Sequence, residues 1–369
     1  MKITCDKRKL NQAVLNIQKA VSTKSSVPAL EGILIRAQEN SVFLCGYDLE
    51  LGITTIFDCN VEEKGSIVLN AKLLAEIVRR LPDATVTISC DEKQMTAIKS
   101  GEAEYSLAGI PAQEYPELPT VSGETTLKIQ SGILRSMIHQ TLFAVAESDA
   151  KPIHTGTLFE LEPNKLRLVS VDGYRLAIRE ESVQTDLETS FVTPGKTLSE
   201  VLKLLDDDDS EVELQIGKRH ILFSIQNYTV ISRLLEGEFL DYRAAVPKEC
   251  STELKVSTQS FINSVERVSL LITDRLKSPI RCLFEDGEIR ISCSTAIGRA
   301  NDKLTAQMTG NSLEIGFNNR FLLDALRNTE CDEIRVQMSG PLSPMRILPP
   351  EGNSFLFLVL PVRLKSSAE

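Results

Sequence analysis

Tryptophan is absent from this sequence, and aromatic residues make up only 5% of its 369 residues. Three histidines are present, and their positions, 139, 154 and 220, do not suit a metal site. None of the eight cysteines forms a C-x-x-C pair, and most lie in apolar runs that are typical of strands. These features argue against a metal site or disulfides, and they predict cores of Leu, Ile and Val that contain reduced thiols.

Long apolar segments are also missing. No run of about 18 apolar residues occurs that could span a membrane. The N-terminus, "MKITCDKRKL", has no apolar segment after its charges, so it does not resemble a secretory signal. With 42% hydrophobic and 25% charged residues, the chain has the balance of a soluble globular protein. We therefore expect a cytoplasmic protein with two or three domains.

Motifs of enzyme chemistry are absent as well. The sequence contains no G-x-S-x-G, P-loop or G-x-G-x-x-G motif. Its one acidic cluster, Asp206–Asp209, lacks the Gly and Glu of a calcium loop and is interpreted as a solvated loop. The segment "VDGYR" contains an Asp that could be read as catalytic, but a tight turn between strands explains it. We predict no catalytic activity, no cofactor and no metal.

The net charge of −10 argues against a general nucleic-acid coat protein, but it leaves room for a localised basic surface. One such surface is predicted on the helix that begins after Asn70. Its apolar stripe includes Leu74 and Ile77, whereas Lys72 and Arg79 lie away from that stripe. A single helix of this kind is adequately explained as a solvated face with ion pairs between its own residues.

The helix recurs twice more, at intervals of 124 residues. Basic, acidic and apolar residues keep their places in all three copies, and each copy precedes an alternating strand. The repeated positions are Lys72, Lys196 and Arg320; Glu76, Glu200 and Asp324; Arg79, Lys203 and Arg327; and Leu74, Leu198 and Leu322. An earlier helix also recurs near residues 6–21, 130–145 and 257–272.

This period is longer than that of solenoid repeats, and it predicts three domains of one fold. Each domain would be α+β, with two amphipathic helices packed on antiparallel sheet. Polar segments mark the joints at "TVSGETT" and "KECSTE". The predicted domains are residues 1–122, 126–248 and 252–369.

The repeated basic positions change the interpretation of the helix. Ion pairing alone would tolerate exchanged signs, yet both positions stay basic in every copy. If equivalent helices line one surface, that surface is a ladder of Lys and Arg, which suits sequence-independent, salt-sensitive contacts with phosphates. The earlier helix of each repeat adds basic residues, but their positions do not repeat cleanly. They are Lys7, Arg8, Lys9, Arg135, His139 and Arg267.

Several segments together resemble one known family. They are "MKI" at the start, "VDGYRLA" at Val171–Ala177, "FLDYRAAVP" at Phe239–Pro247, "EIGFNNRFLLDAL" at Glu314–Leu326 and "VLPVRL" at Val359–Leu364. With the three repeats, the chain resembles a bacterial sliding clamp, the beta subunit of the replicative DNA polymerase, over essentially its whole length. The combination is specific, whereas no single segment is.

The resemblance implies a head-to-tail homodimer that closes into a ring around duplex DNA. Helices would line the hole, sheets would form the outside, and DNA would be held without sequence preference. Such a clamp slides and tethers the polymerase for processive synthesis. The implied partners are a second copy, double-stranded DNA, the clamp loader, the replicative polymerase, and repair and translesion polymerases that bind through short linear motifs.

The resemblance also implies a peptide-binding pocket between the second and third domains. An apolar groove with a few polar groups would fit an extended hydrophobic peptide. The corresponding residues are His154, Asp172, Gly173, Tyr174, Arg175, Leu176, Tyr242, Ala245, Asn318, Phe321, Leu342, Pro344, Met345, Leu358, Leu360, Pro361, Val362 and Arg363. The chain departs from the family at Tyr174, often His, and at Leu360-Pro361-Val362, often Met-Pro-Met.

The family further implies a dimer seam and two loops that contact DNA. At the seam, Tyr105 and Leu107 would meet Leu271 and Ile272 of the other subunit. Lys24 and Lys151 lie in the loops, and the predicted DNA-contacting set is Lys24, Lys72, Arg79, Arg135, Lys151, Lys196, Lys203, Arg320 and Arg327. The alternative function is a three-repeat protein-interaction scaffold that does not encircle DNA, which would leave the basic ladder without a role.

Overall fold

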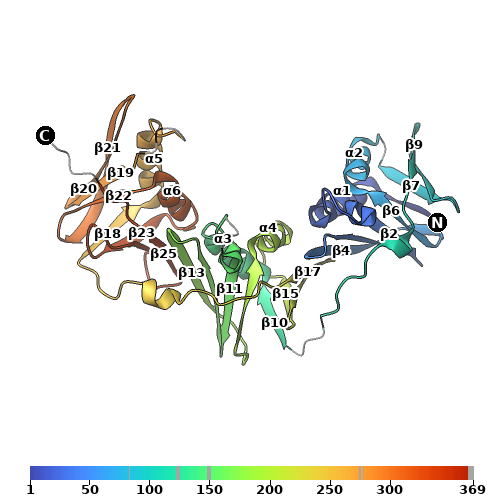
Figure 1. Cartoon of the computed structure of the whole chain (residues 1–369), viewed down its shortest axis with the longest axis horizontal. Coiled ribbons are helices and arrows are strands. Elements are labelled where there is room, and N and C mark those ends of the chain that lie inside the picture. The colour runs from blue at the N-terminus through green and yellow to red at the C-terminus, as the bar shows by residue number, and fades with distance from the viewer. Residues whose placement is uncertain (83, 122–124, 148–150, 274–275, 277, 365–369) are drawn as a thin grey trace. The chain divides into compact units, whose positions relative to one another are not determined.

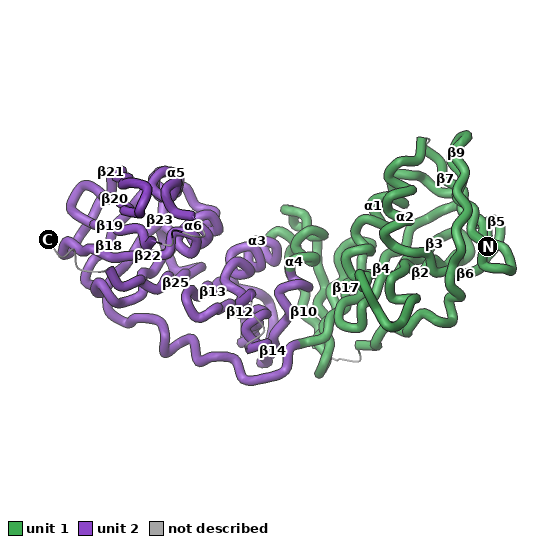
Figure 2. Tube along the Cα trace, turned by 45° about the horizontal axis from the view of Figure 1, so that its top comes forward, with its two compact units in different colours: residues 1–132, 199–234 green, residues 133–198, 235–369 purple. Residues whose placement is uncertain are grey.

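The computed structural model describes residues 1–82, 84–121, 125–147, 151–273, 276 and 278–364. The chain forms two compact units (Figure 2), Met1–Gly132 with Ser199–Leu234, and Ile133–Leu198 with Leu235–Glu369. Part of the predicted first linker and the tail "KSSAE" fall outside the described residues. The domain boundaries at 122, 126, 248 and 252 stay a prediction.

Six α-helices occur in the described part of the chain. They are α1 (Lys7–Ile17), α2 (Ala71–Arg80), α3 (Ser131–Leu142), α4 (Gly195–Leu204), α5 (Thr258–Ser269) and α6 (Asn319–Arg327). Short 3-10 helices are η1 (Gln18–Ala20), η2 (Pro28–Glu31), η3 (Ala112–Glu114), η4 (Pro152–Thr155) and η5 (Tyr242–Ala245). The repeated pair of helices in each predicted domain is therefore confirmed.

Two antiparallel sheets make up the first unit. The smaller has the order β5 (Asn60–Glu63), β1 (Lys2–Asp6), β7 (Thr85–Cys90), β8 (Met95–Ser100) and β9 (Ala103–Ala108). The larger has the order β10 (Thr125–Gln130), β15 (Glu211–Ile216), β16 (His220–Ile225), β17 (Tyr228–Arg233), β4 (Leu51–Asp58), β3 (Ser41–Tyr47), β2 (Gly32–Gln38) and β6 (Gly65–Asn70). Helices α1 and α2 lie side by side next to these strands (Figure 1).

One antiparallel sheet runs through the second unit. Its order is β14 (Thr189–Pro194), β11 (Gly156–Glu162), β12 (Lys165–Val171), β13 (Arg175–Ser182), β25 (Phe355–Val359), β24 (Met345–Leu348), β23 (Glu333–Met338), β18 (Thr252–Ser257), β21 (Gly298–Gly310), β20 (Gly287–Thr295), β19 (Ile280–Glu285) and β22 (Leu313–Phe317). Alternating burial along β23 and β18 matches the period of a strand with one buried face.

Strand pairing between consecutive repeats explains the division into units. β17 of the second repeat pairs with β4 of the first, and β25 of the third repeat pairs with β13 of the second. Strands β10 and β15–β17 of the middle repeat therefore belong to the first unit, and β11–β14 belong to the second. The edges of β9 and of residues 298–306 in β21 are left without a strand partner among the described residues.

The threefold repeat extends to individual backbone hydrogen bonds. A residue after the last strand of each repeat donates its N–H to a strand residue earlier in that repeat. The pairs are Ile110 to Val68 at 2.9 Å, Leu235 to Val192 at 2.9 Å and Val362 to Gly316 at 2.8 Å. This agreement shows that the three segments share one fold as well as one sequence pattern.

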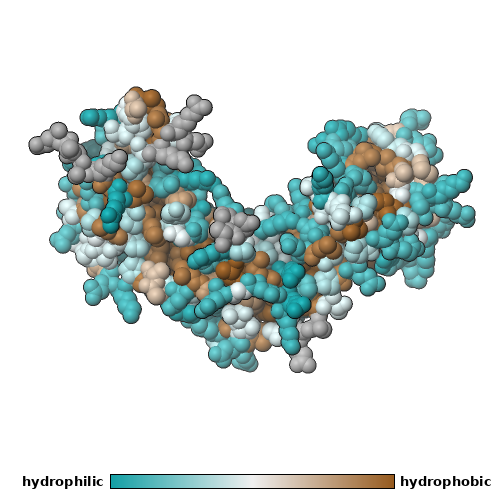
Figure 3. Space-filling view, in the orientation of Figure 1, coloured by the Kyte–Doolittle hydropathy of each residue, from teal (hydrophilic) through white to brown (hydrophobic). Residues whose placement is uncertain are grey.

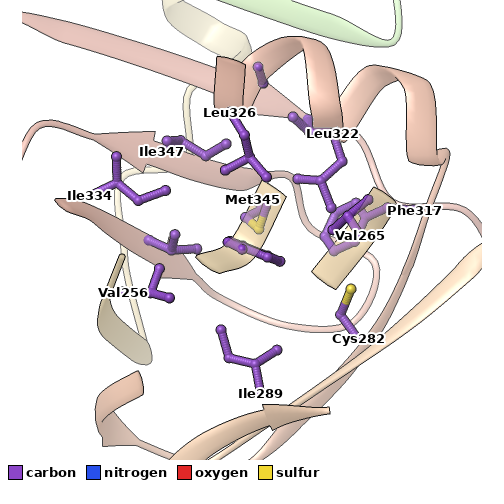
Figure 4. Close-up of a cluster of buried hydrophobic side chains, with 14 of the residues drawn as sticks. Val256, Val265, Cys282, Ile289, Phe317, Leu322, Leu326, Ile334, Met345 and Ile347 are labelled. Carbon is purple, nitrogen blue, oxygen red and sulfur yellow. The ribbon is translucent and has the colours of Figure 1, made fainter. Parts of the chain in front are cut away.

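The core of the third repeat shows how the helices are held. Leu322 and Leu326 of α6 point toward β24, the strand that carries Met345 and Ile347, and all four side chains are buried (Figure 4). Hydrophilic residues cover much of the face seen in Figure 3. Apolar stripes thus turn inward and leave the charged faces of the helices to solvent.

Candidate functional site

The second helix of each repeat presents its basic residues at matching places. Asn70 caps α2 by accepting the N–H of Leu73 at 3.0 Å, and Asn318 caps α6 by accepting the N–H of Arg320 at 3.0 Å. Such caps satisfy donors that a helix start leaves unpaired and fix where the helix begins. In all three helices the first basic residue is consequently the second residue of the helix, at positions 72, 196 and 320.

All six repeated basic side chains are solvent-exposed. Lys72 and Lys196 are exposed at the helix starts. More than half of the side-chain surface is exposed at the other four positions, Arg79, Lys203, Arg320 and Arg327. On the opposite side, the matching leucines at 74, 198 and 322 are fully buried. Each helix thus separates an apolar face from a basic one, as the sequence predicts.

Acidic residues offset this positive charge within α2 and α4. Glu76 pairs with Arg79 at 2.9 Å and also with Arg80, and Glu200 pairs with Lys203 at 2.8 Å. The hydrogen bond from Arg80, together with the charge of Arg79, lowers the pKa of Glu76. Exposed pairs of this kind contribute little to stability, so the basic groups can exchange them for other anions.

Helix α6, the second helix of the third repeat, differs, because its basic residues pair with acids outside the helix. Arg320 pairs with Glu147 at 2.8 Å, and Arg327 pairs with Glu266 at 2.6 Å. Asp324, at the position of Glu76 and Glu200, bonds instead to Arg175. The shared acidic position therefore has two kinds of partner.

The remaining predicted DNA contacts lie in loops and on α3. Lys24 and Lys151 are exposed in loops, whereas Arg135 is half-buried on α3. Near Arg135, His139 Nδ1 lies 3.1 Å from Glu330 Oε1, and the Ser136 hydroxyl donates to the same carboxylate at 2.7 Å. The contact with His139 is the main reason that the pKa of Glu330 is lowered.

The predicted peptide pocket is organised by the turn between β12 and β13. Asp172 Oδ1 accepts the N–H groups of Tyr174 at 2.9 Å and Arg175 at 3.0 Å. Gly173, with φ +90°, provides the left-handed residue that this turn needs. The turn leaves Tyr174 61% exposed while it directs Arg175 inward, where only 5% of that residue is exposed.

Two aromatic rings lie against the buried Arg175. Its guanidinium lies 4.8 Å from the ring centroid of Phe321 and 5.6 Å from that of Phe143. The ring of Tyr174 stacks on Phe321, with centroids 5.4 Å apart. Arg175 also donates to Asp172 Oδ2 at 2.9 Å. Residues from α6 and from the β12–β13 turn thus form one wall of the predicted pocket.

The predicted pocket residues divide by burial. Those at the surface are Gly173, Tyr174, Ala245, Leu342, Leu360, Val362 and Arg363. The half-buried ones are His154, Asp172, Asn318, Phe321, Pro344 and Pro361. Arg175, Leu176, Tyr242, Met345 and Leu358 are buried.

Two hollows flank Val362. One, of about 680 Å³, is lined by Ile272, Thr273, Ser278, Pro279, Asn318, Asn319, Arg320, Phe321 and Val362. The other, of about 460 Å³, is lined by Glu314, Gly316, Pro341, Leu342, Val362, Arg363 and Leu364. We call the surface from Tyr174 over Phe321 and Val362 to Leu342 the Val362 groove. Two predicted pocket residues face other groups: His154 packs on Phe239, and Tyr242 bonds to Glu160.

The predicted seam residues lie next to unpaired strand edges. Tyr105, 37% exposed, and the half-buried Leu107 are on β9. Leu271 and Ile272 are half-buried after α5, and Ile272 also lines the larger hollow. The sequence interpretation missed Leu270, which is 80% exposed.

The sequence repeat could have identified Leu270 as a contact residue. Helices α3 and α5 end 127 residues apart, so Leu270 corresponds to Phe143. Phe143 packs edge-on against Phe357 of the neighbouring repeat, with ring centroids 5.1 Å apart. Leu270, by contrast, is not covered by packing within the described chain, since it is 80% exposed.

Among the described residues, no group of three or more His, Cys, Asp or Glu side chains is arranged to hold a metal ion. No described helix has both the length and the apolar character that a membrane crossing needs.

Comparison with known families gives three matches in tandem. Residues 1–119 match the N-terminal domain of the DNA polymerase III beta subunit, residues 128–241 its central domain and residues 243–363 its C-terminal domain. The beta sliding clamp of Bacillus subtilis is 35% identical over 376 residues, covering 98% of this chain and 100% of the relative. That of Halalkalibacterium halodurans is 33% identical and covers 95% and 97%.

Solved structures agree with these matches. The Bacillus subtilis DNA polymerase sliding clamp superposes with a TM-score of 0.94 at 35% identity, covering 99% of this chain and 100% of that one. A putative DNA polymerase III beta subunit from Eubacterium rectale gives 0.92 at 36% identity, with coverage of 98% and 99%. A sliding clamp from Pseudomonas aeruginosa bound to griselimycin gives 0.93 at 26% identity, with coverage of 99% and 100%.

Proposed function

This chain belongs to the DNA polymerase III beta subunit family, and from that premise we propose that it is a sliding clamp. Two copies encircle duplex DNA without sequence preference and tether the replicative polymerase for processive synthesis. The observation that carries this proposal is the repetition of one domain with exposed basic residues at the same two positions of each second helix. The role requires a cytoplasmic protein with access to DNA.

The two junctions inside the chain support the proposed ring closure. At the first, Val230 of β17 lies opposite Ile53 of β4, and at the second, Phe357 of β25 lies opposite Ala177 of β13. Strands β9 and β21 each have one unpaired edge. From their places in the hairpins β8–β9 and β20–β21, Tyr105 of β9 corresponds to Val230 and Phe357, and Ala300 of β21 corresponds to Ile53 and Ala177.

A third junction of the same kind joins β9 of one copy to β21 of another. Tyr105 then lies opposite Ala300, and Leu107 lies opposite Gly298. This pairing is head-to-tail, and closing it twice unites two chains of three domains in a ring. It also covers two unpaired strand edges, which otherwise invite aggregation. Tyr105, Leu107, Leu270, Leu271 and Ile272 form the seam.

The basic helices hold DNA loosely within the ring. Lys and Arg contact phosphates without reading bases, so the grip is independent of sequence and sensitive to salt. The acids Glu76 and Glu200 compete with DNA for Arg79 and Lys203. Such exchangeable contacts favour sliding over fixed binding. Lys24, Arg135 and Lys151 add further phosphate contacts in this proposal.

The Val362 groove binds short hydrophobic peptides of the polymerase, the clamp loader and the repair and translesion polymerases. Its exposed apolar residues, including Tyr174, Leu342 and Leu360, suit an extended peptide. Griselimycin, which is bound to the Pseudomonas aeruginosa clamp, is a candidate ligand of this groove. The protein itself has no catalytic activity.

The proposal is tested by the length of DNA that a replicative polymerase makes on a primed circular template. With the clamp loader and ATP present, adding this protein should lengthen the product of a single polymerase binding event. Omitting the loader is the control, because a closed ring cannot then enter the circle. Products of equal length with and without the protein contradict the proposal.

A further inference from the structure

The acidic residue at the centre of the second helix has different partners in different repeats. Glu76 in α2 and Glu200 in α4 pair with basic residues of their own helices. Asp324 in α6 occupies the same position, but its carboxylate accepts from Nη1 of Arg175 on β13. Since the three helices share one pattern, this change of partner calls for a local explanation.

The partner of Asp324 is a buried cation between two carboxylates. Arg175 is 5% exposed and also bonds to Asp172 at 2.9 Å. Burying a guanidinium is costly unless it is paired and hydrogen-bonded, and the two carboxylates supply both conditions. Asp172 holds one side of the group from its own turn, and Asp324 holds the other side from α6.

The paired guanidinium packs against aromatic rings. It lies 4.8 Å from the ring centroid of Phe321, and this ring stacks on Tyr174 at 5.4 Å. A planar guanidinium that is fixed by its ion pairs can hold a ring face in place through cation–π attraction. Contacts therefore run in series from Asp324 through Arg175 and Phe321 to Tyr174.

The first junction lacks these groups. The positions of Arg175, Phe321 and Phe143 are occupied there by Leu51, Thr197 and Lys19. The acid of α4, Glu200, correspondingly pairs within its own helix. The network therefore occurs at the one junction inside the chain that carries the Val362 groove.

We propose that Asp324 is a positioning residue of the Val362 groove. Through Arg175 it fixes the ring of Phe321 under Tyr174, so that the groove wall is formed before a peptide arrives. A preformed wall spares the ligand the cost of ordering these side chains. The inference rests on the proposed function, because it concerns ligand binding in that groove.

The test measures the affinity of the full-length protein for griselimycin by calorimetry. Asp324→Asn keeps the shape of the side chain and removes its charge, so binding should weaken by about tenfold, the effect of losing one charged hydrogen bond. Glu200→Gln is the matched control at the same helical position and should bind as the unaltered protein does. Asp324→Glu should recover most of the affinity.

A second variant separates positioning from stability. Replacing all three charged groups, Arg175→Met with Asp324→Leu and Asp172→Asn, removes the buried charges and keeps the oxygen that accepts the N–H groups of the turn. The melting temperature should therefore stay near that of the unaltered protein. The affinity of this triple variant for griselimycin should nevertheless fall as in Asp324→Asn. Normal affinity in the triple variant, or in Asp324→Asn, contradicts the role of Asp324. Failure of the unaltered protein to bind griselimycin would contradict the proposed role of the Val362 groove as a ligand-binding site.

Discussion

The backbone N–H of Leu360 donates to the carbonyl oxygen of Tyr174 at 2.9 Å, where the third repeat joins the second. The first junction contains the same bond, from Arg233 to Glu50, also at 2.9 Å. The two junctions thus share a backbone arrangement that does not depend on the side chains. A third copy of that arrangement, made between two chains, is the basis of the proposed ring.

The seam predicts a specific effect of Leu270→Asp. Because Leu270 is 80% exposed in the single chain, the substitution should leave the melting temperature of the monomer nearly unchanged. In the dimer it buries a charge, so dissociation should increase by at least about tenfold. Analytical ultracentrifugation over a dilution series measures this.

Leu342→Asp serves as the control for the seam, since Leu342 is also exposed but lies in the Val362 groove. It should weaken griselimycin binding and leave the dimer intact. An unchanged dimer in the Leu270 variant would exclude the proposed pairing of β9 with β21.

The basic ladder predicts that reversing Lys72, Lys196 and Arg320 to Glu weakens DNA binding. The slope of log affinity against log salt should become shallower by about one for each lost phosphate contact. Fluorescence anisotropy with duplex DNA at several salt concentrations measures both quantities. The fold should persist, because all three side chains are exposed.

A matched control reverses the exposed Lys64, Lys218 and Lys248, which lie outside the helices, with the same change in net charge. Its DNA affinity should fall far less. Equal losses in the two triple variants would mean that net charge, and no particular surface, governs binding.

The lowered pKa of Glu330 predicts a contribution to stability that is lost at low pH. Its pKa lies below the usual 4.5, mainly because of the contact with His139. A carboxyl with a lowered folded-state pKa stabilises the protein above its unfolded pKa, and this stability is lost as pH falls through the folded-state pKa. Glu330→Gln should therefore flatten the decline in unfolding free energy below about pH 4.5.

Urea unfolding at a series of pH values checks the Glu330 prediction, with the exposed Glu351→Gln as control. The control should follow the unaltered protein throughout. A Glu330 variant whose decline matches that of the unaltered protein would remove Glu330 from the account of acid stability.

The packing of α2 predicts that substitutions at two adjacent leucines lower the free energy of unfolding by very different amounts. Leu74 is fully buried and Leu73 is 46% exposed. Leu74→Ala should lower the free energy of unfolding by about 2–5 kcal/mol through lost burial and a cavity. Leu73→Ala should change it by about 0.5 kcal/mol or less. Chemical unfolding measures both, and similar losses would contradict the assigned buried face.

The sequence was sufficient to predict features that depend on local periodicity. The stripe around Leu74 identified α2, and its recurrence around Leu198 and Leu322 identified α4 and α6. Exposure of the basic positions followed from the same periodicity, because a helix turns its faces at a fixed angle per residue. The threefold α+β fold is confirmed for this reason.

Features that depend on distant contacts could not be predicted in this way. Asp324 and Arg175 are separated by 149 residues, and no local pattern shows that they meet. The burial of Leu176 and Leu358, both predicted for the pocket, depends on the pairing of β13 with β25. Leu270 could have been found from its correspondence with Phe143, although its role becomes clear only from the contact that Phe143 makes.

The central claim, topological tethering, is tested most directly by retention on circular DNA. The protein is loaded onto nicked plasmid by the clamp loader, free protein is removed, and half of the sample is linearised with a restriction enzyme. A closed ring should stay on the circle and slide off the linear ends, so gel filtration should show protein with circular DNA only. Equal retention on circular and linear DNA would contradict encirclement.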